Sequence, residues 1–552
     1  MSVFYIGNIT QKEDFENLYS SNDLNCNLLY RKSKRKALFQ KKEARFLFNS
    51  AKPVFKDVDY NSEIQPISKN FKTIITEGQN NFCTIDIEVK NGLLTLSVSS
   101  ARIGRDRIYF FKTQNGVYLS DDIRELIPLT NRKFNPNAFY SILKFGDTPE
   151  FITCIEGINS VPVGSFWTGD VQSFINSIEI NDFTPYYKMS YDFMGGDIKE
   201  THSILDSVFS YLGKQDVLLP ISGGVDSSII NYMINDHRDD NYPAYYMRFG
   251  DDDPEVEFAK AAVKNTKADL RVYEMKSVDF IEAFNFQSKT AIQPIGESST
   301  IAIAYFFKQC EFEDHLVLDG TLADGCYGST NYLEDCPVPP PKSNLRSKAE
   351  EKIASHLQLK HLPGGYKFFP RDSFIEDSFI QQLNIYVGPL GNTLFKNVKG
   401  INSNIEEYFK YYYQLLETKG DLEKDDWMKY SLFKMYNYAS KNNTAKSFDN
   451  VGIANSACYP FMWKEVLDNQ GKYSWKEKTQ DGVIKFPLKK ILESYVDKDF
   501  IYRKKVGLNS SFEEWVCTQQ NKKFLTSIIE KKRKFSLSSN GEFEYEKAHE
   551  SF

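Results

Sequence analysis

The chain has 552 residues, which is more than one hydrophobic core usually supports, so we expect two domains. Hydrophobic residues make up 41% and charged residues 26%, and an aromatic fraction of 15% argues against disorder over most of the length. A formal net charge of −6 gives no general electrostatic reason to bind nucleic acid. The eight cysteines never form a C-x-x-C pair, so we expect reduced thiols rather than zinc ligands or a disulfide framework.

We expect the protein to be cytoplasmic. The N-terminal segment MSVFYIGNITQKEDF has no basic region followed by an apolar run, and no stretch of about eighteen apolar residues occurs in the sequence. These observations also lead us to expect contact with neither a membrane nor nucleic acid.

The first 190 residues are predicted to form a β-rich domain. The runs FCTIDIEV, LLTLSVSS, RIYFFK and GVYLS are short and either alternating or apolar, as in strands. Asn91-Gly92 and Asn115-Gly116 lie between these runs and are typical of hairpin turns. The region therefore predicts consecutive hairpins.

A second domain is predicted over residues 195–530. Here apolar runs alternate with glycine or acidic turns and with helical patterns, which is typical of a parallel sheet with crossover helices. Four runs are the candidate strands: VLLPI (217–221), AYYMRF (244–249), LRVYEM (270–275) and HLVLD (315–319). We thus expect a two-domain protein of mixed α/β and α+β class.

Three further features are predicted in the C-terminal half. PVPPPKSNLRSK (337–348) should be an exposed loop, because its prolines lack the N–H donor that a helix or central strand requires. The segments around 403–418, 422–441 and 487–496 have helical patterns. Residues 531–552 are predicted to be a polar, poorly ordered tail.

A glycine- and serine-rich loop, LPISGGVDSS (219–228), joins the first candidate strand of the second domain to a helical pattern. Gly223 and Gly224 let the backbone bend so that successive N–H groups face one point, and the dipole of the following helix adds positive potential. Hydroxyl groups of three residues can add donors, namely Ser222, Ser227 and Ser228. The loop therefore predicts a phosphate site.

Asp226 adds a carboxylate to this loop. An acid that faces phosphate without a cation would be repelled, so the pattern implies a bridging Mg²⁺ and nucleotide chemistry. The plain alternative is a glycine turn whose Ser or Asp caps the next helix, which is common but explains less of the residue order. The loop lacks the lysine of a Walker A motif and does not match G-x-G-x-x-G.

The run SGGVDSS resembles the pyrophosphate loop of ATP pyrophosphatases, particularly of the asparagine synthetase B family. The resemblance implies ATP and Mg²⁺ as cofactors. It also implies a glutaminase-like β-sandwich of Ntn type over residues 1–190. An ATP pyrophosphatase domain, of the adenine nucleotide α-hydrolase type with C-terminal helices, would follow over 195–530.

Two more segments extend the resemblance. The sequence from 247 to 260 is similar to the family's adenine-binding segment, which implies that Met247 and Gly250 line the base. LDGTLADGCYG (318–328) aligns with the family's L-S-G-x-G-A-D-E-x-F-G. This implies that Gly320 contacts the nucleotide and that Asp324 is the second carboxylate on Mg²⁺.

YRKKVGL (502–508), followed by a Phe-Glu-Glu-Trp run, resembles the family's R-x-K-x-G signature. The resemblance implies that Lys505 stabilises charge on the adenylate and on the later tetrahedral intermediate, as a fixed ammonium can do in a dry site. Arg503 is a second candidate for phosphate contact. Without its neighbours, such a basic triplet would more often be a solvated surface.

The first domain resembles the family's glutaminase domain over VSSARIGRDR (98–107) and YLSDDIREL (118–126). Glutaminases of this group use an N-terminal cysteine, whereas residue 2 here is Ser, and the segments that hold glutamine in relatives are missing. We therefore predict the fold without the activity. The organisation is closest to glutaminase-deficient relatives such as β-lactam synthetases and lasso peptide cyclases, which take their amine from the substrate itself.

The 318–328 segment also departs from the family pattern. Thr321, a weak base, lies where relatives carry Glu, Tyr or His beside the incoming amine, and Asp319 replaces the usual Ser and is an alternative base. Leu322 replaces a Gly, so the loop is not expected to keep the family's backbone if that Gly needs a positive φ. The run GTLAD also resembles the G-T-N-A-D of sulfur-transferring ATP pyrophosphatases.

The leading hypothesis is an ATP-dependent, AMP-forming ligase. It would adenylate a small-molecule or peptide carboxylate and form an amide, lactam or isopeptide without glutamine. Two alternatives stay open: a nucleotide-binding scaffold that has lost catalysis, and transfer of sulfur or another nucleophile to an adenylated substrate through a cysteine such as Cys326. The sequence leaves open a homodimer and a carrier or peptide-delivery partner.

Overall fold

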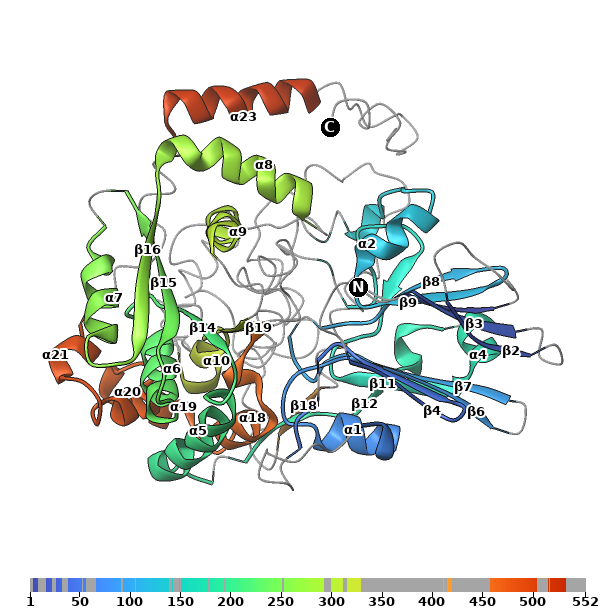
Figure 1. The fold of residues 1–552 in the computed structure, drawn as a ribbon, viewed down its shortest axis with the longest axis horizontal. Helices are drawn as coiled ribbons and strands as arrows, with labels where there is room; N and C mark the ends of the chain where they lie inside the picture. The colour runs from blue at the N-terminus through green and yellow to red at the C-terminus, as the bar shows by residue number, and fades with distance from the viewer. Residues whose placement is uncertain are drawn as a thin grey trace, which may run out of the picture.

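The computed structural model describes residues 38–328 with short gaps, the longest at 56–65, and also residues 457–503, 517–532, 3–7, 16–21, 26–31, 411, 415–418 and 515. Figure 1 shows the N-terminal strands gathered in one half and a helix-covered sheet in the other.

The N-terminal half contains two six-stranded sheets whose neighbouring strands are antiparallel. The first sheet has the order β10 (Ile158–Ser160), β8 (Tyr109–Thr113), β9 (Gly116–Ser120), β1 (Val3–Gly7), β3 (Cys26–Arg31) and β2 (Glu16–Ser21). The second has the order β12 (Thr184–Pro185), β11 (Ser165–Asp170), β7 (Leu93–Ser99), β6 (Thr84–Lys90), β5 (Arg45–Asn49) and β4 (Leu38–Lys42). The predicted β-rich character is confirmed, and the hairpin expected at Asn115 joins β8 to β9. The Ntn type and the boundary at residue 190 stay predictions.

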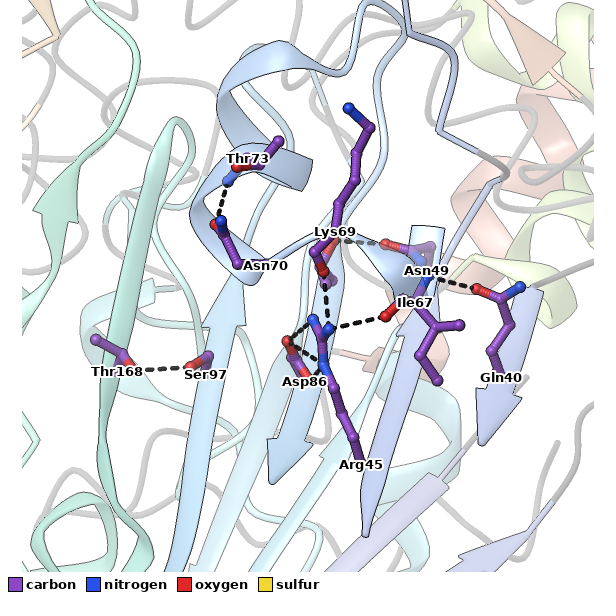
Figure 2. A network of polar contacts seen from close by, with 11 residues as sticks. Gln40, Arg45, Asn49, Ile67, Lys69, Asn70, Thr73, Asp86, Ser97 and Thr168 are labelled. Carbon is purple, nitrogen blue, oxygen red and sulfur yellow. Dashed lines mark hydrogen bonds and ion pairs between the residues drawn. The ribbon is translucent and has the colours of Figure 1, made fainter. Parts of the chain in front are cut away.

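Apolar side chains from both sheets share one core. Phe4 and Ile6 of β1 are buried in the same cluster as Ile85 and Ile87 of β6, with the two-residue period expected of strands that face each other. The short helices of this half are α1 (Phe71–Glu77), α2 (Ile123–Leu126) and α4 (Val171–Asn176). Figure 2 shows a polar network on the second sheet, in which Arg45 is bonded to Asp86 and to the chain just before α1.

The second half is built on a five-stranded parallel sheet. Its order is β16 (Ala268–Met275), β15 (Tyr242–Phe249), β14 (Val217–Pro220), β17 (Leu316–Leu318) and β19 (Ala457–Cys458). All four candidate strands are therefore confirmed, and the protein is a mixed α/β structure with a parallel sheet. Because β15 lies on one side of β14 and β17 on the other, the chain order reverses at the carboxyl end of β14, which is where open α/β sheets usually bind ligands.

Helices surround this sheet (Figure 1). Those described are α5 (Ile198–Leu212), α6 (Val225–Asp236), α7 (Glu255–Val263), α8 (Phe280–Thr290), α9 (Ser299–Gln309), α10 (Ala323–Tyr327), α18 (Lys464–Gln470), α19 (Trp475–Lys478), α20 (Phe486–Leu492), α21 (Lys498–Ile501) and α23 (Gln519–Lys532). Helix α6 packs against α5 and α20, α8 packs against α9, and α23 lies along α8. In the part of the chain that the structure describes, no helix is long and apolar enough to cross a membrane.

One helix prediction is wrong in part. Residues 416–418 form the strand β18 (Leu416–Thr418), which pairs in parallel with β13 (Met189–Tyr191). The pairing partner lies more than two hundred residues away, and a local helical pattern cannot reveal it. The helix expected at 487–496 is present as α20, whereas the segments 337–348 and 422–441, and all but the first two residues of 531–552, lie outside the described residues.

Candidate nucleotide site

The loop between β14 and α6 has the backbone that an anion cradle needs. Gly223 has φ +68°, and a Cβ there would lie 2.5 Å from the carbonyl carbon of Phe258, so only glycine fits. Gly224 is the N-cap of α6 and supplies no side-chain cap. The first N–H groups of this twelve-residue helix therefore have no capping side chain at its N-cap and can bind an anion.

The three serines of the loop take different positions. The hydroxyl groups of Ser222 and Ser227 lie 3.2 Å apart, and the Ser227 oxygen also accepts the Ser222 N–H at 3.1 Å. Ser228 is fully buried, and its hydroxyl has no hydrogen-bond partner among the described residues. The structure thus brings Ser222 and Ser227 together at the loop and turns Ser228 into the interior.

Asp226 and Asp324 converge on one cation, the ammonium group of Lys485. The Lys485 Nζ lies 2.6 Å from Asp226 Oδ2 and 2.6 Å from Asp324 Oδ1. The lysine side chain is 7% exposed, whereas those of Asp226 and Asp324 are 21% and 41% exposed. Burial lowers the pKa of Lys485, but the two carboxylates outweigh burial and raise the pKa above its ordinary value. The two acids that were expected to share a metal ion therefore lie close enough to bind one cation together.

Lys485 is the residue that the sequence did not reveal. It lies in the left-handed region (φ +55°) directly before α20, far along the chain from both acids. A single lysine before a helix carries no pattern that distinguishes it from a surface lysine. The helix predicted around residues 487–496 places Lys485 near a helix start, but it does not indicate a role in the site.

The donor set fits a magnesium ion shared with a nucleotide. Both groups are carboxylates, and Mg²⁺ in nucleotide enzymes is usually bound by one or two carboxylates together with phosphate oxygens. Within the described residues, no group of three or more His, Cys, Asp or Glu side chains could enclose a metal by itself. The arrangement therefore suits a metal that phosphate groups help to hold.

The second loop lies against the first. A Cβ at Gly320 would be 2.9 Å from the Cβ of Asp226. Asp319, at the end of β17, accepts the N–H of Thr321 at 2.9 Å, and the Thr321 hydroxyl bonds the same oxygen. Burial raises the pKa of Asp319, and the charge of Asp226 adds to the rise. An acid with a hydroxyl partner and a raised pKa thus lies beside the paired carboxylates.

Leu322 corrects one expectation. It has φ +79° and ψ −8°, the left-handed conformation that Leu in place of Gly was expected to prevent. Its side chain is only 2% exposed and packs in the main apolar core. Burial of this side chain offsets the strain of the backbone, so the loop keeps a glycine-like turn without glycine.

The segment expected to bind adenine lies at the carboxyl end of the neighbouring strand β15. The Met247 side chain packs against the apolar cluster that contains Trp515. Gly250 has φ +76°, donates its N–H to the carbonyl of Met275 at 3.1 Å, and has open space where a Cβ would be. Met247 therefore contributes to the core, while Gly250 exposes backbone on the edge of the sheet that carries the two loops.

The C-terminal basic residues are described only in part. Arg503 donates to the carbonyl oxygen of Gly223 at 3.0 Å, so it contacts the backbone of the phosphate loop. Lys505 and Ser2 lie outside the described residues. The charge-stabilising role expected of Lys505 and the loss of glutaminase activity stay predictions.

Comparison with known proteins agrees with the motifs. The sequence model of the asparagine synthase family matches residues 211–550. A relative described as asparagine synthetase [glutamine-hydrolyzing] 1, from Bacillus subtilis (strain 168), is 21% identical over 453 residues, in an alignment that covers 77% of this chain and 66% of that protein. The chain thus spans just under two thirds of the length of this curated relative.

Two solved structures show weaker likeness. An NH3-dependent NAD synthetase from Campylobacter jejuni is 15% identical in sequence, with a TM-score of 0.19. The match covers 39% of this chain and 93% of the synthetase chain. An NMN synthetase from Francisella tularensis is 10% identical, also with a TM-score of 0.19, and the match covers 40% of this chain and 98% of the synthetase chain. These scores are too low to support an argument. The family model, by contrast, covers more than half of the chain, and this protein is therefore a member of the asparagine synthase family.

Proposed function

We propose that this protein is an ATP-dependent, AMP-forming ligase. In the first step a carboxylate oxygen attacks the α-phosphate of ATP, which gives an acyl-adenylate and pyrophosphate. In the second step an amine attacks the acyl carbon, AMP leaves, and the amine proton passes to a base. The observation that carries the proposal is the convergence of Asp226 and Asp324 on Lys485 beside an uncapped helix N-terminus.

The residues divide the first step between them. The N–H groups at the start of α6, with the hydroxyls of Ser222 and Ser227, bind the outer phosphates. Asp226 and Asp324 would hold Mg²⁺, and the ion would supply positive charge against the leaving pyrophosphate. Lys485 then supplies a fixed positive charge to the reacting carboxylate and to AMP. The family resemblance implied this role for Lys505, which lies outside the described residues, and the position of Lys485 supports the same role for Lys485.

For the second step we propose Asp319 as the group that takes the amine proton. It lies on the loop that touches Asp226, and Thr321 fixes its orientation through two hydrogen bonds. Burial and the charge of Asp226 raise the pKa of Asp319, which makes it a better proton acceptor than an ordinary carboxylate. The amine comes from the substrate rather than from glutamine, which suits intramolecular attack and its high effective concentration.

The proposal also includes the substrate class, the cellular compartment and the partners. The acid is a small-molecule or peptide carboxylate, and the protein acts in the cytoplasm without nucleic acid. A homodimer or a carrier partner is compatible with this activity.

Two alternatives make different predictions. A scaffold that has lost catalysis would bind ATP and release no AMP, and Thr321 in place of a stronger base is the observation that favours it. Sulfur transfer through Cys326 is less well supported, because that thiol is fully buried and burial raises its pKa to about 12. A thiolate nucleophile needs exposure and a lowered pKa.

The deciding experiment incubates the protein with Mg²⁺ and ATP labelled on the α-phosphate, and adds carboxylic acids one at a time. The proposal expects AMP and pyrophosphate to form only with a particular acid. If the protein binds ATP but forms no AMP with any acid tested, peptides included, the ligase proposal is wrong and the non-catalytic scaffold is favoured.

A further inference from the structure

Arg503 follows α21 and reaches the phosphate loop. Its Nη2 donates to the carbonyl oxygen of Gly223 at 3.0 Å. Its guanidinium carbon lies 3.6 Å from the ring centroid of Phe258, within cation–π range, and its Nη1 lies 3.5 Å from a carboxylate oxygen of Glu255. The side chains of Arg503 and Glu255 are each 12% exposed. The guanidinium is therefore fixed by the loop and by the first turns of α7.

The bond to Gly223 constrains a peptide group that glycine would otherwise leave free to turn. The carbonyl of Gly223 and the N–H of Gly224 belong to one planar trans peptide, so they point in opposite directions. Rotation of this peptide changes ψ of Gly223 and φ of Gly224, which is now −74°, and glycine tolerates either sign of φ at little cost. In the observed orientation the Gly224 N–H faces the Ser222 hydroxyl oxygen at 3.3 Å, on the side away from Arg503.

The opposite orientation of this peptide would spoil an anion site. It would place a carbonyl oxygen beside Ser222, where its partial negative charge would repel phosphate. A charged donor on the Gly223 carbonyl opposes that rotation, and a hydrogen bond to a charged group is stronger than one between neutral groups.

We propose that Arg503 is a positioning residue that holds the Gly223–Gly224 peptide with its N–H toward the phosphates of ATP. This inference rests on the phosphate-binding role given to the loop in the proposed function. It differs from the direct phosphate contact expected from the sequence, because Arg503 acts through the backbone of the loop. Glu255 and Phe258 keep the guanidinium in place.

The test compares three full-length variants. Arg503→Met keeps much of the side-chain volume and removes the donor, and Arg503→Lys keeps a charge without the flat fork that stacks on Phe258. Lys498→Met is the matched control, because Lys498 lies in the same segment and its side chain is 70% exposed. Calorimetry measures binding of a non-hydrolysable ATP analogue with Mg²⁺, and binding of AMP, which lacks the outer phosphates.

We expect Arg503→Met to weaken binding of the ATP analogue by about tenfold, the loss expected for one charge-assisted hydrogen bond. AMP binding should stay as in the wild type, Arg503→Lys should be intermediate, and Lys498→Met should bind both ligands normally. Equal weakening for both ligands with a matching fall in melting temperature would show a purely structural role and overturn the proposal. Unchanged binding of the analogue by Arg503→Met would also overturn it.

The proposed function fails separately. If the wild type binds the analogue and Arg503→Met does not, but no acid elicits AMP, the positioning role stands and the ligase does not. If the wild type binds no analogue, both are refuted.

Discussion

Arg45 in the β-sandwich and Lys485 beside the parallel sheet both bind carboxylates, but their surroundings differ. Arg45 bonds Asp86 through Nε at 2.9 Å and gives its Nη1 to the carbonyls of Ile67 and Lys69 at 2.9 and 2.8 Å (Figure 2). Asp86 is 7% exposed, so this pair is closed to other ligands. The carboxylates around Lys485 remain partly exposed, at 21% and 41%.

The difference separates a structural pair from a reactive one. A buried charge whose partners are all internal holds the fold, and it cannot change partners without a large desolvation cost. Acids that are still reachable from solvent can exchange an ammonium for a metal ion and phosphate. The same residue types thus hold the fold in one half of the protein, and in the other half they form the site to which the proposed function gives a chemical role.

The largest effect is expected from the loss of Lys485. Lys485→Met should lower the rate of AMP formation at saturating Mg²⁺ and ATP by about a thousandfold, because a preorganised charge at the reacting groups is lost. The rate would be measured with labelled ATP and the active acid. Lys490→Met, at a partly exposed lysine in the helix α20 that follows Lys485, should react normally. A Lys485→Met enzyme within tenfold of wild type would contradict the role given to this lysine.

The structural side predicts the reverse outcome. Arg45→Met should lower the free energy of unfolding by about 3 kcal/mol, because it removes the guanidinium group from a buried carboxylate. The affinity for the ATP analogue should not change. Urea denaturation and calorimetry would measure the two quantities, with Lys42→Met at an exposed neighbouring site as the control. If Arg45→Met bound the nucleotide more weakly and kept its stability, the structural role given to Arg45 would be wrong.

Two glycines sharpen the account of the phosphate loop. Gly223 and Gly250 both have positive φ, but a Cβ at Gly223 would meet the backbone of Phe258, whereas one at Gly250 would meet open space. Gly250→Ala should cost about 1 kcal/mol of stability from backbone strain alone. Gly223→Ala should cost at least about 2 kcal/mol more, since the overlap adds to the strain. Equal losses in urea denaturation would show that the loop relaxes freely.

A third buried cation extends the comparison to pH. Lys478 is 2% exposed, donates to the neutral Gln470 at 2.6 Å, and burial lowers its pKa to about 7. The unfolded lysine has a pKa near 10.4, so between these values only the unfolded state is protonated and stability rises with pH. Lys478→Met should remove up to about 1.4 kcal/mol per pH unit of this rise. Identical slopes for both proteins from pH 7 to 10 would show that Lys478 stays charged.

Local patterns predicted much of the fold and half of the site. The strands β14 to β17 are dense apolar runs, and glycine with serine at the end of β14 marks the loop. Because carboxyl ends of parallel strands share one edge, the meeting of Asp226 and Asp324 was predictable from their motifs.

The remaining features depend on contacts between distant segments. Lys485 reaches Asp226 from 259 residues away, and nothing near it marks its role. The left-handed turn at Leu322 is held by burial of its side chain, which the sequence of the loop does not encode. The pairing of β18 with β13 likewise joins segments that are more than two hundred residues apart.

The most direct test of the central claim is a crystal structure with a non-hydrolysable ATP analogue and Mn²⁺ in place of Mg²⁺. The account predicts an anomalous peak bound by Asp226 and Asp324, with the outer phosphates at the N-terminus of α6 and Lys485 beside them. Nucleotide bound elsewhere, or Lys485 still paired with both acids and no metal between them, would contradict it.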